Sequence, residues 1–189
     1  MHSGWGIVVS VDERAQVVDR RRIVVAHNNG PRGNQPYHRA EQLGLPKAEK
    51  YLADYIAATD SLARQEIGTV VSDLKARGYR VTRASILLAS GRTLPPLPKI
   101  LAAHPLIHTA EGELFRNTAR RACESLGIPV MGLRQRDLED TAKKTLGTSS
   151  AEIITEIARA GKSLGPPWTA DHKAAALGAY MALDQNSVR

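Results

Sequence analysis

The chain has 189 residues, of which 42% are hydrophobic and 24% are charged, and its net charge is +7. This length and composition are typical of one soluble globular domain with a core of its own, so residues 1–189 are expected to form a single domain. The scarcity of aromatic residues (one Phe, two Trp and five Tyr) argues against a platform of stacked rings for single-stranded nucleic acid.

The sequence predicts a cytoplasmic protein that makes no membrane contact. No segment approaches the run of about 20 apolar residues that a membrane-spanning helix needs. The first residues, MHSGWGIVV, lack the basic region that precedes the apolar part of a signal peptide. With Cys123 as its single cysteine, the chain forms no intrachain disulfide.

The first half of the chain predicts a hairpin, a loop, a helix and a strand. GWGIVVSV and AQVVDRRRIVVA flank the turn residues DER, which is typical of a β-hairpin within residues 1–26. Residues 27–46 are dense in Gly, Pro and Asn and predict a loop. Apolar residues at helical spacing predict a helix over residues 47–77. YRVTRASILLAS predicts a strand over residues 79–90, with an apolar second half that is buried on both faces.

The second half predicts helices around one more strand. A proline-rich connector, GRTLPPLPKI, leads to a helix from Pro105 to Leu126, and IPVMGL then predicts a short strand. Three further helices are expected in RQRDLEDTAKKTLG, SSAEIITEIARAG and WTADHKAAALGAYMAL. This order predicts an α/β fold: a mixed sheet with an N-terminal hairpin and helices on both faces. Right-handed crossovers make the two later strands parallel.

Several segments resemble one family of proteins. AEGELFRNTARRACESLGIPVMGLRQRDLEDTAKKTLG is similar to the helix–strand–helix segment of RuvC-type Holliday-junction resolvases, which belong to the ribonuclease-H-like superfamily. WTADHKAAALGAYMAL resembles the closing helix of that family, and SGWGIVVSVDERAQVVDRRRIVV resembles its second and third strands. The resemblance implies a ribonuclease-H-like fold, DNA or another nucleic acid as partner, and Mg²⁺ or Mn²⁺ ions held by carboxylates.

Most of the carboxylates that such a centre needs are missing. If GWGIVVSV corresponds to the second strand of the family, the strand that carries its first Asp would precede Met1. If it corresponds to the first strand, it holds no carboxylate before Asp12. RASILLAS has no counterpart of the central Glu, so Asp171 alone matches the family's set. We therefore expect a RuvC-like protein that is degenerate as a nuclease.

A second group of residues predicts a different metal site. HPLIHTAEGE contains His104, His108, Glu111 and Glu113, of which His108 and Glu111 share one face of the expected helix. A carboxylate beside a buried apolar stripe needs a partner. Together with Asp171 and His172, these two would form a mixed nitrogen and oxygen site, with Glu111 and Asp171 as the catalytic carboxylates. The alternative is a purely structural pairing of His108 and Glu111, with each other at the helix surface or with an arginine.

Tyr37, His38 and Arg39 form a third candidate group, for binding, within the expected loop. The alternative is that these polar residues are simply solvated. Three functions follow from these patterns: a degenerate nuclease, a metal-dependent enzyme of another class, and a non-catalytic assembly protein on the same scaffold, with a homodimer as the candidate oligomer. The motifs of phosphate-binding loops, dinucleotide sites, zinc proteases and α/β-hydrolases are absent.

Overall fold

The computed structural model describes residues 1–14, 16–26, 33–89 and 93–184. The strands are β1 (Trp5–Val11), β2 (Val17–Val24), β3 (Ala84–Leu88) and β4 (Val130–Arg134). The α-helices are α1 (Pro36–Glu41), α2 (Leu45–Ala76), α3 (Leu97–Leu101), α4 (His104–Ser125), α5 (Leu138–Leu146), α6 (Ser150–Leu164) and α7 (Ala170–Asp184). Two short 3₁₀ helices, Gln135–Asp137 and Gly147–Ser149, flank α5. Within the described ranges, no helix is both long enough and apolar enough to cross a membrane.

The strands form two small sheets. β1 and β2 make the expected antiparallel hairpin, and β3 and β4 pair in parallel, which confirms the expected direction of the later strands. We expected one mixed sheet, and this was wrong for the part of the chain that the structure describes: no ladder joins β1 to β3. The physical reason is a cavity that separates the two strands.

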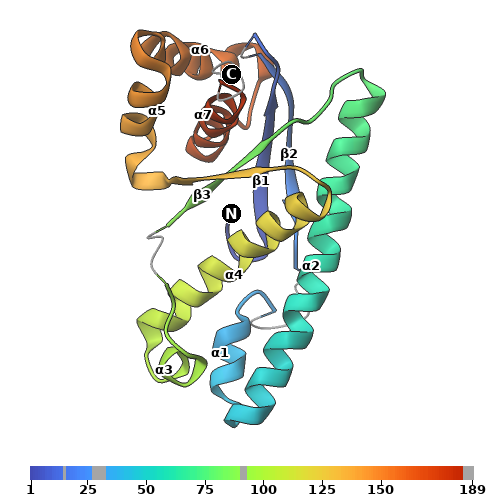
Figure 1. Cartoon of the computed structure of the whole chain (residues 1–189), viewed down its shortest axis with the longest axis vertical. Helices are drawn as coiled ribbons and strands as arrows, with labels where there is room; N and C mark the ends of the chain where they lie inside the picture. The colour runs from blue at the N-terminus through green and yellow to red at the C-terminus, as the bar shows by residue number, and fades with distance from the viewer. Residues whose placement is uncertain (15, 27–32, 90–92, 185–189) are drawn as a thin grey trace.

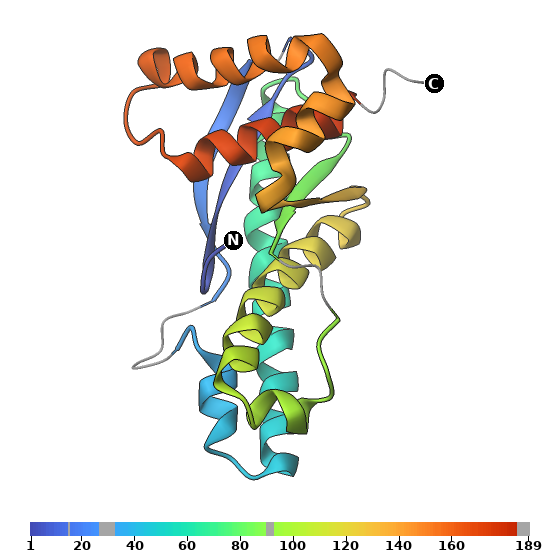
Figure 2. The same ribbon diagram turned by 90° about the vertical axis from the view of Figure 1, so that its left-hand side faces the viewer.

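Helices cover both faces of the strands, as expected. Helix α7 packs against both β1 and β3, while α2 and α4 pack against β2 and β3 (Figures 1 and 2). Successive strand residues point to opposite faces, and the core divides accordingly. Val8 packs into a cluster with residues of α2 and α4, whereas its neighbour Val9 packs into a cluster with residues of α7. The hairpin therefore contributes to two apolar layers.

The small residues of α7 let its backbone lie close to β3. A Cβ atom at Gly178 would come within 2.7 Å of the Ser85 hydroxyl, so this position has no room for a side chain. On the same helix Leu177 and Met181 are buried in the core. This close approach explains why the closing helix is rich in small residues, without any catalytic role for it.

Two helices lie where the sequence predicted irregular chain. Helix α1 occupies part of the expected loop, and α3 occupies part of the proline-rich connector. Both begin with proline in the first turn, a position where proline is well tolerated because the N–H it lacks would have no helical partner. Strand β3 is shorter than the expected 79–90, because its partner β4 extends for only five residues.

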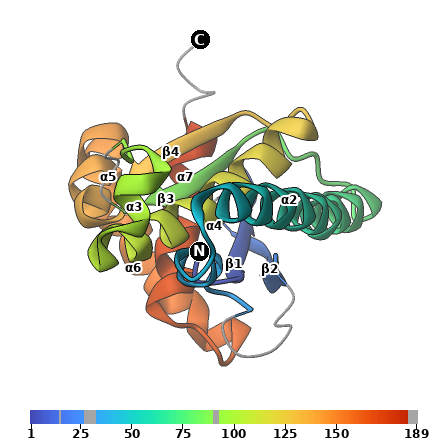
Figure 3. The same ribbon diagram turned by 90° about the horizontal axis from the view of Figure 1, so that it is seen from below.

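The long helix α2 spans the molecule and connects its two ends. At one end, α1, α3 and the start of α4 pack together with the first turns of α2 (Figure 2). Figure 3 views the molecule from this end. At the other end, α5 and α6 pack against each other and against α7. The candidate residues of the sequence are divided between these two regions.

Candidate metal centre

Three histidines gather where α1 meets the first turns of α4. His38 comes from α1, and His104 and His108 come from α4. One possible ligand atom of each lies within 4.8 Å of the others, so the group could hold a metal ion. The Nε2 atoms of His104 and His108 are 3.0 Å apart. The His38 ring lies 5.1 Å from the His104 ring and 4.8 Å from the His108 ring, measured between centroids.

Helix geometry brings two of these side chains together. Residues four apart lie on the same face of an α-helix, which makes His104 and His108 neighbours. Both are exposed, whereas His38 is only 7% exposed. One histidine of the cluster is therefore buried, and the other two are open to solvent.

Glu111, one turn beyond His108 on α4, fixes the orientation of His38. Its side chain is buried, and its Oε1 lies 2.9 Å from Nδ1 of His38. With the carboxylate as acceptor, Nδ1 carries the proton and donates it, which leaves the lone pair of the His38 ring on Nε2. Nε2 is thus the His38 atom that is free to bind a metal ion.

The same carboxylate also holds the backbone of α1. The N–H of His38 donates to Oε1 of Glu111 over 3.3 Å. This N–H lies in the first turn of α1, where backbone donors have no partner within the helix. Gln35, the residue at the N-cap, makes no side-chain capping bond. Glu111 therefore supplies from α4 the acceptor that the start of α1 lacks.

Burial and the negative charge of Glu111 raise the pKa of three tyrosines from α1 and α2. Burial raises the pKa of Tyr37, and the negative charge of Glu111 raises it further. For Tyr51 and Tyr55 burial is again the main cause of a raised pKa, and Glu111 adds to it. The phenols are therefore neutral at physiological pH. The fixed charge next to His38 is that of the carboxylate, which favours a cation at the cluster.

Asp171 and His172 lie elsewhere. Oδ2 of Asp171 accepts a hydrogen bond from Nε2 of His2 over 2.8 Å. Nδ1 of His172 lies 2.8 Å from the hydroxyl of Thr169, and the backbone N–H of Thr169 donates to it over 3.3 Å. Among the described residues, none of these contacts reaches the three histidines. The structure thus divides the expected group of His108, Glu111, Asp171 and His172, because α7 packs on the strands while Glu111 faces α1.

His172 is buried and neutral. Burial lowers its pKa most, the positive charge of Arg20 lowers it further, and the negative charge of Asp171 opposes both. Accepting a bond from Thr169 at Nδ1 requires the unprotonated nitrogen, in agreement with this direction. The geometry gives His172 a structural role at the first turn of α7.

The group Tyr37, His38 and Arg39 is split by the direction of its side chains. His38 enters the histidine cluster, Tyr37 packs against apolar residues of α3 and α4, and Arg39 is exposed and donates to the side chain of Gln42 over 3.2 Å. Sequence reasoning noted His104 but did not place it in the site. Its spacing of four residues from His108 was the available signal.

The donor set fits a tetrahedral ion. Zinc binds imidazole nitrogens at about 2.0–2.1 Å, which sets neighbouring nitrogens about 3.4 Å apart, and catalytic zinc sites use three protein ligands and one open position. The Nε2 atoms of His104 and His108 are already close to that separation. Metal-binding histidines usually donate their other ring N–H to a carboxylate or carbonyl oxygen, which is what His38 does with Glu111.

No protein-family model, curated protein or solved structure matches this chain.

Proposed function

We propose that this protein binds one divalent transition-metal ion of the Zn²⁺ type through His38, His104 and His108. The observation that carries the proposal is the Glu111–His38 bond, which leaves Nε2 as the free nitrogen of a buried histidine whose ring lies against the rings of His104 and His108. A buried carboxylate with this partner is the usual support of a metal-binding imidazole.

The donor set favours zinc over the Mg²⁺ or Mn²⁺ that the family resemblance implies. Imidazole nitrogens suit Zn²⁺, Cu²⁺, Ni²⁺ and Fe²⁺, whereas Mg²⁺ prefers carboxylate, carbonyl and water oxygens. The three ligands here are all imidazoles, and the nearby carboxylate of Glu111 is engaged with His38.

The open side of the cluster suits chemistry on water. An ion held by three histidines supplies a bound water whose pKa falls to about 7, which makes a nucleophile available at neutral pH. His104 and His108 bind at the exposed rim, where solvent and a substrate have access. Glu111 orients His38 and increases the electron density that its ring donates. We infer a metal-assisted hydrolase or hydratase.

Metal content and calorimetry test the proposal. The purified chain is titrated with Zn²⁺ alone, and separately with Mg²⁺, and we expect one tightly bound Zn²⁺ per chain and much weaker Mg²⁺ binding. The double variant H104N/H108N is expected to lose the site. H2N is the matched control, because His2 bonds to Asp171 away from the cluster. Equal Zn²⁺ binding by H104N/H108N and the unchanged chain would refute the proposal.

A second proposal is a nucleic-acid-related role on a ribonuclease-H-like scaffold. It is favoured by the hairpin, by the parallel pair, and by a closing helix that contacts both sheets and carries Asp171 in its first turn. The net charge of +7 agrees with a polyanionic partner. Electrophoretic mobility shift with junction and duplex DNA tests it. Phosphate contacts are strongest at low salt, so the absence of a shift there would refute it.

A further inference from the structure

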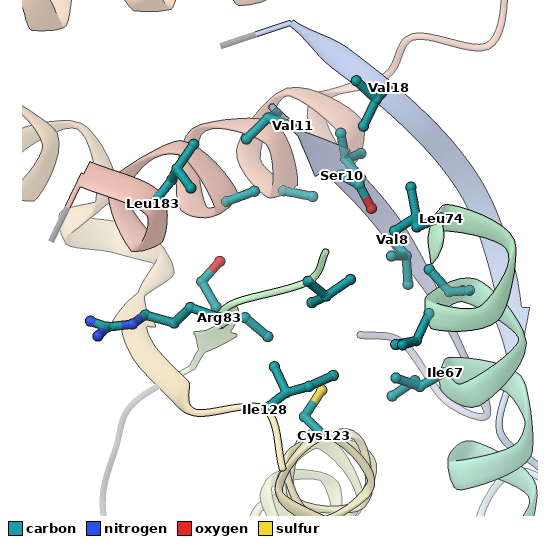
Figure 4. Close-up of a pocket in the computed structure, with 18 of the residues that line it drawn as sticks. Val8, Ser10, Val11, Val18, Ile67, Leu74, Arg83, Cys123, Ile128 and Leu183 are labelled. Carbon is teal, nitrogen blue, oxygen red and sulfur yellow. The ribbon is translucent and has the colours of Figure 1, made fainter. Parts of the chain in front are cut away.

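A cavity of about 880 Å³ separates β1 from the segment that leads into and forms β3. β1 and residues 79–87 line its two sides, and helices close it above and below (Figure 4). On one face it is lined by Ala175, Ala179 and Leu183 of α7, and on the other by Ile67 and Leu74 of α2 and Cys123 of α4. The cavity is thus bounded by one strand on each side and by a layer of helices on each face. A space of this shape fits one extended polypeptide segment.

The backbone of β1 has a free edge on this cavity. In an antiparallel pair, residues alternate between those that bond to the neighbouring strand and those that point away from it. The carbonyl of Gly4 accepts the N–H of Val25, so Gly4 faces the β2 side. Residues of the opposite parity, including Ile7 and Val9, therefore direct their N–H and C=O groups into the cavity. Buried backbone groups of this kind normally have partners.

The first residues of the chain already turn back along this edge. His2 and Trp5 form an antiparallel bridge in which the N–H of His2 donates to the carbonyl of Trp5 over 2.8 Å. Ser3 and Gly4 make the turn between them, and Gly4 adopts a φ of +82°, a conformation typical of glycine in tight hairpins. The turn therefore directs the backbone at Met1 along the free edge of β1.

The surroundings of Met1 suit a peptide bond better than a charged amine. Met1 lines the cavity, and burial and the positive charge of Arg116 lower the pKa of its amine. Arg116 also donates to the carbonyl of Leu87 over 3.1 Å, which sets Met1 close to the carboxyl end of β3. A strand that reaches Met1 from within the cavity is thus antiparallel to β1 and parallel to β3.

We propose that the cavity is the seat of a β-strand joined to Met1 through the His2–Trp5 turn. Its backbone pairs with β1 on one side and β3 on the other, and this unites the two sheets in the order β2, β1, inserted strand, β3, β4. Because helices cover both faces, the strand is almost continuously apolar. Its larger side chains face Ala175 and Ala179, where α7 leaves room. The inference is independent of the metal site.

The first test is the N-terminus of the protein as its own cells produce it. Mass spectrometry of the native protein is expected to find residues ahead of Met1, enough for an apolar strand of at least five residues. A native chain that begins at Met1 would overturn the proposal.

The second test locates the strand by hydrogen exchange on the native, extended chain. The amides of Ile7 and Val9 are expected to be as strongly protected as those of Val8 and Ser10, which alternate with them and, like Gly4, direct their backbone groups toward β2. In the 189-residue chain, only Val8 and Ser10 are expected to be protected. Fast exchange at Ile7 and Val9 in the extended chain would overturn the placement, even if extra residues exist.

Discussion

The histidine cluster and the cavity beside β1 are both built from segments far apart in the sequence, but they differ in how their polar groups are satisfied. At the cluster, the buried carboxylate of Glu111 meets both the ring and the backbone of His38. Along the cavity, β1 pairs with β2 on one side, while its other edge has only the His2–Trp5 bridge among the described residues. The buried polar groups of the first region have partners within the chain, whereas the second region has room for a segment of polypeptide.

The largest effect is expected from His38→Ala, a substitution in the histidine cluster. The substitution removes one of the three proposed metal ligands and leaves the buried carboxylate of Glu111 without its partner ring. The backbone N–H of residue 38 still donates to Glu111, but the bond from the ring is lost, and a hydrogen bond to a charged group is worth about 1.5–3 kcal/mol. The unfolding free energy should fall by that amount, and Zn²⁺ affinity should fall more than the roughly 100-fold typical of losing a partner of a metal-binding histidine. Urea unfolding and zinc calorimetry measure the two effects. His108→Ala, at an exposed position, should lose zinc without the loss of stability.

Glu111→Gln tests the charge of the carboxylate at the same cluster. The amide oxygen can still accept a hydrogen bond from Nδ1 of His38, while the negative charge is removed. Zinc affinity should fall about 10- to 100-fold, as for other partners of metal-binding histidines. Calorimetry at constant pH measures the loss. Unchanged affinity would show that the carboxylate has no influence on the ion. Glu152→Gln on α6 is a matched control, because that carboxylate is exposed and lies away from the cluster.

Ala179→Leu distinguishes a filled cavity from an empty one. In the extended native chain the added bulk should meet the inserted strand and lower the unfolding free energy by about 1–3 kcal/mol, as overpacking does. In the 189-residue chain the cavity should accept the leucine with no loss of stability. Ala151→Leu, at an exposed position of α6, should have little effect in either chain. Equal effects of Ala179→Leu in both chains would contradict the strand.

The smallest effect concerns His172, in the first turn of α7. Its pKa in the folded protein is lowered, so between pH 6.5 and the lower folded value the unfolded chain binds a proton that the folded chain does not. Stability should therefore be complete above about pH 6.5 and decrease as the pH falls through this window. His172→Asn keeps an acceptor for Thr169 and does not titrate, so its urea midpoint should depend less on pH. An identical pH profile in the variant would contradict the prediction.

The sequence predicted the helices better than the contacts between them. Apolar residues at spacings of three and four mark α2 and α4 locally, and a helix needs no distant partner for its hydrogen bonds. The short helix α1 was missed because its six residues lie in a segment rich in Gly, Pro and Asn. The separation of β1 from β3 was not predicted either. Which strands become neighbours depends on packing across the whole chain, and no local sequence pattern contains that information.

The histidine cluster was predictable in part. His108 and Glu111 were candidates on the expected helix, and the spacing of His104 and His108 could have identified the pair. What no local pattern contains is the approach of His38, which belongs to another helix. The role of Glu111 depends on that approach, since only the structure distinguishes a carboxylate that binds a metal from one that holds a histidine.

The contact of Glu111 with the first turn of α1 has a consequence for ligand-linked folding. A helix of six residues is too short to persist alone in water, so α1 is held by its tertiary contacts, of which His38 provides two. An ion shared by His38, His104 and His108 would bind only when α1 is docked on α4. By mass action, each tenfold rise in free ion above its dissociation constant would add about 1.4 kcal/mol to the cost of undocking α1. The metal ion would then hold α1 against α4. The rate of proteolysis between α1 and α2 would report how much of the metal site is occupied.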